Sequence, residues 1–96
     1  MLTSLAGMEN TKSNRQYIML VVRGMFGELG FTLKHKGIDY YMYTLGDNYG
    51  SVLMDSVSVC CCVNGHVTYI YPDSWDEDYV DTLLDDIKAH LYGSEF

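Results

Sequence analysis

The dipeptide Asn64-Gly65 constrains the fold of this 96-residue chain more than any other pair of neighbouring residues. It separates two runs rich in β-branched residues, cysteine and tyrosine: VSVCCCV at 57–63 and HVTYIY at 66–71. Asn-Gly is the preferred sequence of a two-residue type I′ turn, because both central residues of that turn take positive φ. The dipeptide predicts a β-hairpin with this register: Val63 opposite His66, Cys62 opposite Val67, Cys61 opposite Thr68, Cys60 opposite Tyr69 and Val59 opposite Ile70.

This register divides the hairpin into two faces, because neighbouring residues of a strand point to opposite sides of the sheet. The more apolar face is expected to pack under helices, and it carries Val57, Val59, Cys61, Val63, Thr68 and Ile70. The opposite face is neither clearly polar nor clearly apolar, and it carries Ser58, Cys60, Cys62, Val67, Tyr69 and Tyr71.

The three consecutive cysteines cannot all bind one metal ion, because the pleat separates Cys61 from Cys60 and Cys62. His66 lies on the face opposite to Cys60 and Cys62, and the chain has no second cysteine pair at the spacing of a structural zinc site. Nothing around the cysteines indicates an activated thiol either. We expect the cysteines to act as small hydrophobic residues, and we predict no metal, no cofactor and no catalytic residue.

Hydrophobic periodicity predicts the elements before this hairpin. Residues 16–29 place apolar side chains on one helical face, with Gly30 at the C-terminal cap, and a strand over 17–22 is the alternative. Strands are expected over 31–36, 38–45 and 51–63, with a loop over 46–50. The last strand is either continuous or broken by a bulge near Asp55 and Ser56.

The region after the hairpin carries the signals of a second helix, over about 75–92. Pro72 ends the preceding strand, and Ser74 with Glu77 three residues later has the pattern of a capping box. Trp75 is expected to act as a hydrophobic staple near the helix start. The helix has one apolar stripe, formed by Val80, Leu83, Leu84, Ile87 and Leu91.

These elements predict an α+β fold: an antiparallel sheet of three to four strands with an N-terminal and a C-terminal helix, in α-β-β-β-β-α order. The length corresponds to one domain. Residues 1–15 are expected to be a flexible N-terminus and residues 16–92 the single domain. Residues 93–96 match what two adjoining restriction sites would encode, so we expect them to be a cloning remnant.

The charge is concentrated in the second half of the chain. Residues 1–54 carry a net charge of +1, whereas residues 55–96 carry nine acidic residues against Lys88 alone, a net charge of −8. Direct binding to nucleic acid is disfavoured, because phosphate contacts need Lys and Arg. A basic protein partner is compatible with this charge.

No apolar run approaches the roughly 18 residues of a membrane span, so no membrane partner is predicted. The N-terminus also lacks the pattern of a signal peptide. We expect a cytoplasmic protein with reduced cysteines, located in the host cytoplasm if the chain is phage-encoded.

The sequence contains no recognisable catalytic motif, whereas its acidic and tyrosine-rich segments suggest a binding function. The C-terminal helix directs several aspartates outward, either as a simple solvated face or as an acidic stripe that imitates a phosphate backbone. The tyrosines either stabilise the sheet or form a binding surface. The residues expected to bind a partner are Asp76, Asp78, Asp81, Asp85, Tyr69 and Tyr71.

In size, acidity and lack of a catalytic signature, the chain resembles the small inhibitor proteins of bacteriophages and mobile elements, such as anti-CRISPR proteins and DNA mimics. This is a resemblance of type and covers no motif. It implies a non-enzymatic inhibitor that binds a basic, nucleic-acid-handling protein. The alternatives are a homodimeric structural or assembly protein that buries the face of Cys60, Cys62, Tyr69 and Tyr71, and a small-molecule-binding domain or enzyme.

Overall fold

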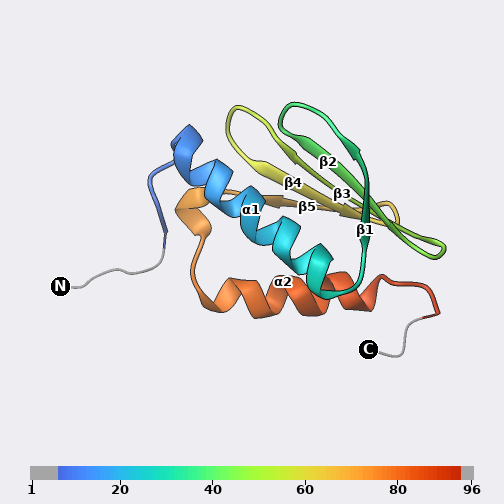
Figure 1. The fold of residues 1–96 in the computed structure, drawn as a ribbon. Helices are drawn as coiled ribbons and strands as arrows, with labels where there is room; N and C mark the ends of the chain where they lie inside the picture. The colour runs from blue at the N-terminus through green and yellow to red at the C-terminus, as the bar shows by residue number, and fades with distance from the viewer. Residues whose placement is uncertain (1–6, 94–96) are drawn as a thin grey trace.

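A computed structural model describes residues 7–93, and in this range one antiparallel sheet packs against two α-helices (Figure 1). The sheet has five strands rather than the predicted three to four, in the sequential order β1-β2-β3-β4-β5. The predicted α+β class and the order of helix, strands and helix are confirmed. The elements are α1 (Lys12–Glu28), β1 (Thr32–Lys36), β2 (Tyr40–Leu45), β3 (Asn48–Met54), β4 (Val59–Val63), β5 (His66–Ile70), the 3-10 helix η1 (Pro72–Ser74) and α2 (Asp78–Ala89).

The hairpin at Asn64-Gly65 forms as predicted. Asn64 and Gly65 take positive φ values of 51° and 89°, as a type I′ turn requires. Each predicted cross-strand pair of β4 and β5 is present, from Val63 opposite His66 to Val59 opposite Ile70.

The fifth strand arises because the predicted long strand over 51–63 is two strands, β3 and β4, that pair with each other. The predicted bulge is a tight connection at residues 55–58, in which Asp55 Oδ1 accepts hydrogen bonds from the backbone N–H groups of Val57 (2.9 Å) and Ser58 (2.7 Å). These two bonds hold the pKa of Asp55 below its ordinary value. The Asp55 carboxylate thus stabilises a chain reversal in a segment that contains no glycine or proline, the residues that often indicate a turn.

The predicted loop over 46–50 is also shorter than expected. Leu45 pairs directly with Asn48, so only Gly46 and Asp47 form the turn between β2 and β3. Gly46 has a φ of +58°, which suits the first central position of a two-residue hairpin turn.

The first helix is confirmed, and the alternative strand over 17–22 does not form. α1 begins four residues earlier than predicted, at Lys12, because the Thr11 hydroxyl accepts a hydrogen bond from the N–H of Asn14 at 3.1 Å. Gly30 follows the helix with a φ of +94°, in the conformation of a glycine that ends a helix.

The second helix is shorter than predicted, and its capping box does not form. Ser74 belongs to η1, and Glu77, the residue before α2, makes no side-chain capping bond. Instead, Asp76 Oδ1 accepts the N–H of Asp78 at 2.7 Å. The short helix that begins at Pro72 moves the start of α2 three residues beyond Trp75.

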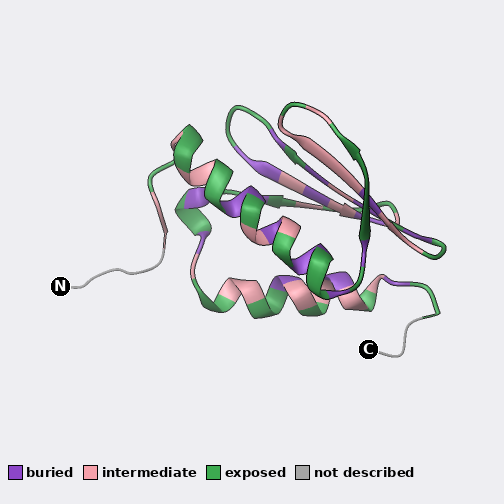
Figure 2. Cartoon of the chain, viewed as in Figure 1, coloured by how far each residue is buried: buried purple, intermediate pink, exposed green. Residues whose placement is uncertain are grey.

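Both helices cover the same face of the sheet, and the buried residues lie between these layers (Figure 2). On the predicted inner face of the hairpin, four residues are buried: Val59, Cys61, Val63 and Ile70. Of the other two, Thr68 is half-buried, and Val57 is 54% exposed because it lies in the connection before β4. Burial raises the pKa of the Cys61 thiol to about 12.

The opposite face of the sheet carries no helix of the described chain. Cys60 and Cys62 are half-buried there, whereas Val67, Tyr69 and Tyr71 are exposed.

Within residues 7–93 no helix has the length and apolar character that a membrane crossing requires. The predicted flexible segment and the predicted cloning remnant lie partly outside the described residues, at 1–6 and 94–96.

Candidate functional site

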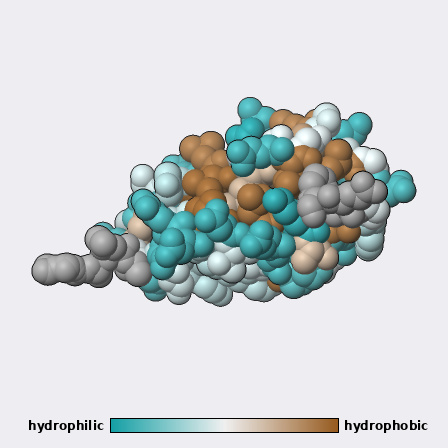
Figure 3. Space-filling view, turned by 90° about the horizontal axis from the view of Figure 1, so that it is seen from below, coloured by the Kyte–Doolittle hydropathy of each residue, from teal (hydrophilic) through white to brown (hydrophobic). Residues whose placement is uncertain are grey.

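The four aspartates predicted to bind a partner lie on α2 or just before it. Asp78, Asp81 and Asp85 are exposed, and their spacing of three and four residues places them along one side of the helix. Within residues 7–93 none of the four, including half-buried Asp76, forms an ion pair with Lys or Arg. Viewed from below, on the α2 side, the surface shows hydrophilic residues beside hydrophobic patches (Figure 3).

The two predicted tyrosines line a small hollow that we call the tyrosine groove. It has a volume of about 140 Å³, and its lining residues are Tyr69, Ile70, Tyr71, Ser74 and Tyr79. The groove therefore joins the end of β5 to the first turn of α2. Burial raises the pKa of Tyr79 above its ordinary value.

Two lining residues of the tyrosine groove have a carboxylate directly before them in the chain. Asp73 precedes Ser74, and Asp78 precedes Tyr79. An Arg or Lys side chain suits such a site, because aromatic faces attract cations and carboxylates form charge-assisted hydrogen bonds with them. The groove is smaller than the roughly 300 Å³ at which drug-sized ligand pockets begin, so it suits one side chain better than a whole small molecule.

A second hollow lies on the other side of the same connection, between α1 and Trp75. It has a volume of about 410 Å³, and Asp76 and Glu77 are among its lining residues. The ring of Tyr17 meets Trp75 edge-on, with 6.3 Å between ring centroids. This hollow thus combines aromatic walls with two carboxylates, whereas the tyrosine groove is lined by aromatic, aliphatic and hydroxyl side chains. Asp81 and Asp85 extend the negative charge along α2, away from the segment between β5 and α2.

The open face of the sheet is the candidate surface for the homodimer alternative. Leu53, Val67 and Tyr69 are between 42% and 59% exposed on it. Cys60 lies between two of them in the ladder, since it pairs with Leu53 on β3 and with Tyr69 on β5. The face therefore offers a continuous apolar and aromatic row across three strands.

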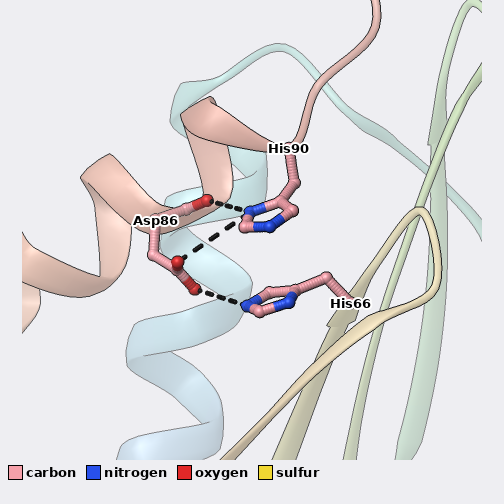
Figure 4. Close-up of side chains that lie close together, drawn as sticks. All are labelled: His66, Asp86 and His90. Carbon is pink, nitrogen blue, oxygen red and sulfur yellow. Dashed lines mark hydrogen bonds and ion pairs between the residues drawn. The ribbon is translucent and has the colours of Figure 1, made fainter.

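The structure also gathers a cluster that the sequence did not predict: His66, Asp86 and His90 (Figure 4). His66 Nε2 lies 3.1 Å from Asp86 Oδ2, and His90 Nδ1 lies 3.8 Å from Asp86 Oδ1. The two imidazole rings are nearly parallel, with 3.7 Å between their centroids. Candidate ligand atoms of all three residues lie within 4.8 Å of one another, so the cluster has the dimensions of a metal site.

Part of this cluster can be read from sequence. The hairpin register already directs His66 to the helix-covered face, and Asp86 and His90 are four residues apart on one helix, so they are neighbours. The sequence does not indicate how α2 docks on the sheet, and that docking brings Asp86 to β5.

Comparison with protein-family models, curated proteins and solved structures finds no match to this chain, so its function is argued from its own residues.

Proposed function

We propose that this chain is a small, non-enzymatic interaction protein that binds a basic protein partner, as an inhibitor of the phage or mobile-element type would. The observation that carries the proposal is the tyrosine groove, in which Tyr69, Tyr71 and Tyr79 meet the acid-rich start of α2. An Arg or Lys of the partner would enter the groove, and the exposed aspartates of α2 would contact the surrounding basic surface.

The charge distribution supports a partner that itself handles nucleic acid. The second half of the chain carries a net charge of −8, which repels phosphate and attracts the basic grooves in which nucleic acids bind. Asp78, Asp81 and Asp85 form a row of carboxylates that are free of ion pairs to Lys or Arg within residues 7–93. Such a row can occupy positions that phosphates would otherwise take.

The test is a binding titration of a short arginine-rich peptide at several salt concentrations. The quadruple variant D76N/D78N/D81N/D85N should bind at least tenfold more weakly, and its affinity should depend less on salt. A matched control, E9Q/E28Q/D39N/D47N, changes the net charge by the same amount in the other half of the chain. Equal affinity and equal salt dependence of the two quadruple variants would refute the proposal.

A second candidate function, homodimerisation through the open sheet face, is favoured by the exposed row of Leu53, Cys60 and Tyr69. Apolar rows on an uncovered sheet are a common basis of interfaces between chains. Sedimentation at micromolar concentration separates the two candidates, because a monomer there is incompatible with an obligate dimer.

A further inference from the structure

We propose that His66, Asp86 and His90 bind a divalent transition-metal ion of the zinc class. Two imidazoles and one carboxylate form a donor set that zinc accepts, and nickel and copper also favour imidazole. The three residues come from two parts of the fold. His66 begins β5, Asp86 lies on α2, and His90 is the residue directly after α2.

The distances in the cluster fit a tetrahedral ion. Zinc binds nitrogen and oxygen at about 2.0–2.2 Å, so two ligand atoms of a tetrahedral site should lie about 3.4 Å apart. The 3.1 Å between His66 Nε2 and Asp86 Oδ2 is close to that value, and candidate ligand atoms of all three residues lie within 4.8 Å of one another. Because the two imidazole rings are stacked, at least one of them must rotate before both direct a nitrogen at the same ion.

The hydrogen bonds of the metal-free cluster show which nitrogens are available. His90 Nδ1 lies 2.8 Å from the backbone oxygen of Asp86, which only accepts, so Nδ1 carries the proton and Nε2 keeps a lone pair. His66 Nε2 donates to Asp86 Oδ2 in the same way. An ion bound between His66 and Asp86 would take the place of this proton, which would move by way of solvent to Nδ1 of the same ring, so that the ligand stays a neutral imidazole.

Neighbouring groups hold the ligands in place, as they do around protein metal sites. Thr68 Oγ1 donates to Asp86 Oδ2 at 3.3 Å, and Asn64 Nδ2 donates to the backbone oxygen of His90 at 2.7 Å. The ligand side chains are 36–41% exposed, so an ion can enter from solvent. Three protein ligands leave a fourth position for water, as in exchangeable rather than closed structural sites.

The proposal is tested by isothermal titration of Zn²⁺ into the C60S/C62S variant, which removes the two half-buried thiols as competing ligands. We expect one ion per chain, and at least tenfold weaker binding in this background when H66N or H90N is added. H35N is the matched control, because His35 is an exposed histidine on β1, outside the cluster, and it should bind as the parent does. No binding by the parent, or binding that H66N and H90N leave unchanged, would overturn the proposal.

A second measurement on the unsubstituted chain does not depend on how the variants fold. Co²⁺ added to the protein should shift or broaden the imidazole proton resonances of His66 and His90 and leave those of His35 in place. Equal effects on all three histidines would overturn the proposal, since they would show unspecific binding.

Discussion

Cys60, Cys61 and Cys62 are neighbours in the chain, but the pleat of β4 gives them different surroundings. Cys61 is 2% exposed among the residues between helices and sheet, whereas Cys60 and Cys62 are half-buried on the open face. The thiolate is the reactive form of cysteine. With a pKa of about 12, the Cys61 thiol is almost entirely protonated at neutral pH.

Labelling with a thiol reagent at mildly alkaline pH should therefore distinguish the cysteines. In the C60S/C62S variant, where only Cys61 remains, we expect reaction at least a hundredfold slower than in a C61A variant, because the thiol is both buried and protonated. The fast reaction should return in urea. Equal labelling rates of the two folded variants would contradict the assignment of Cys61 to the core.

Asn64 shows how one residue can serve both a turn and a tertiary contact. Its backbone takes the positive φ of the hairpin turn, while its side-chain nitrogen donates to Asn48 Oδ1 at 2.9 Å and to the backbone oxygen of His90 at 2.7 Å. Asn48 in turn accepts the N–H of Tyr92 at 2.7 Å. The two amides therefore fasten the end of α2 to the turns of the sheet, and they position His90.

At the scale of elements, the packing of α1 on the sheet depends on a glycine in β3. The ring of Phe26 lies over Gly50 and stacks on Tyr43, with 5.0 Å between centroids. A Cβ atom at Gly50 would lie 2.9 Å from Cζ of Phe26 and nearer still to Cε1. A side chain at this position would push the helix away from the sheet.

Gly50→Ala should therefore lower the free energy of unfolding by about 1–3 kcal/mol, through overpacking of the core. Gly24→Ala is the matched control, because Gly24 lies inside α1 with nothing within 4 Å of an added Cβ, and it should raise stability by up to about 1 kcal/mol. Urea unfolding measures both effects. Destabilisation by G24A equal to that by G50A would contradict this packing.

Local signals explain which elements could be predicted from the sequence. Asn64-Gly65 determined the whole β4–β5 register, because the turn type and the register depend only on neighbouring residues. The β3–β4 turn was missed, because residues 55–58 contain no glycine or proline and the reversal depends on the Asp55 side chain. The start of α2 was misplaced because the short helix at Pro72 competes with the capping pattern of Ser74.

The candidate site shows the same division between local and tertiary information. Composition and spacing identified the aspartates and tyrosines of the 69–85 region as candidates. The groove between Tyr71 and Tyr79 and the contact of His66 with Asp86 depend on how α2 docks against β5, which no local pattern encodes.

For the molecule as a whole, the exposed carboxylates of α2 and the apolar row of the open face lie on opposite sides of the sheet. Both helices cover one face of the sheet, and α2 carries the exposed carboxylates, while the open face carries Leu53, Val67 and Tyr69. The tyrosine groove lies at the junction, where β5 leads into α2. The negative electrostatic field of α2 would steer a basic partner toward the groove, and aromatic contacts at the start of α2 would bind it.

The central claim is that this groove and the adjoining carboxylates recognise a basic partner. It is tested most directly by mapping amide chemical shifts of the isotope-labelled protein during titration with a short arginine-rich peptide. The account predicts saturable shifts that are largest at Tyr69, Tyr71, Tyr79 and the neighbouring aspartates and that shrink as salt is added. Shifts centred on Glu28, Asp39 and Asp47, or no saturable shift at low salt, would contradict it.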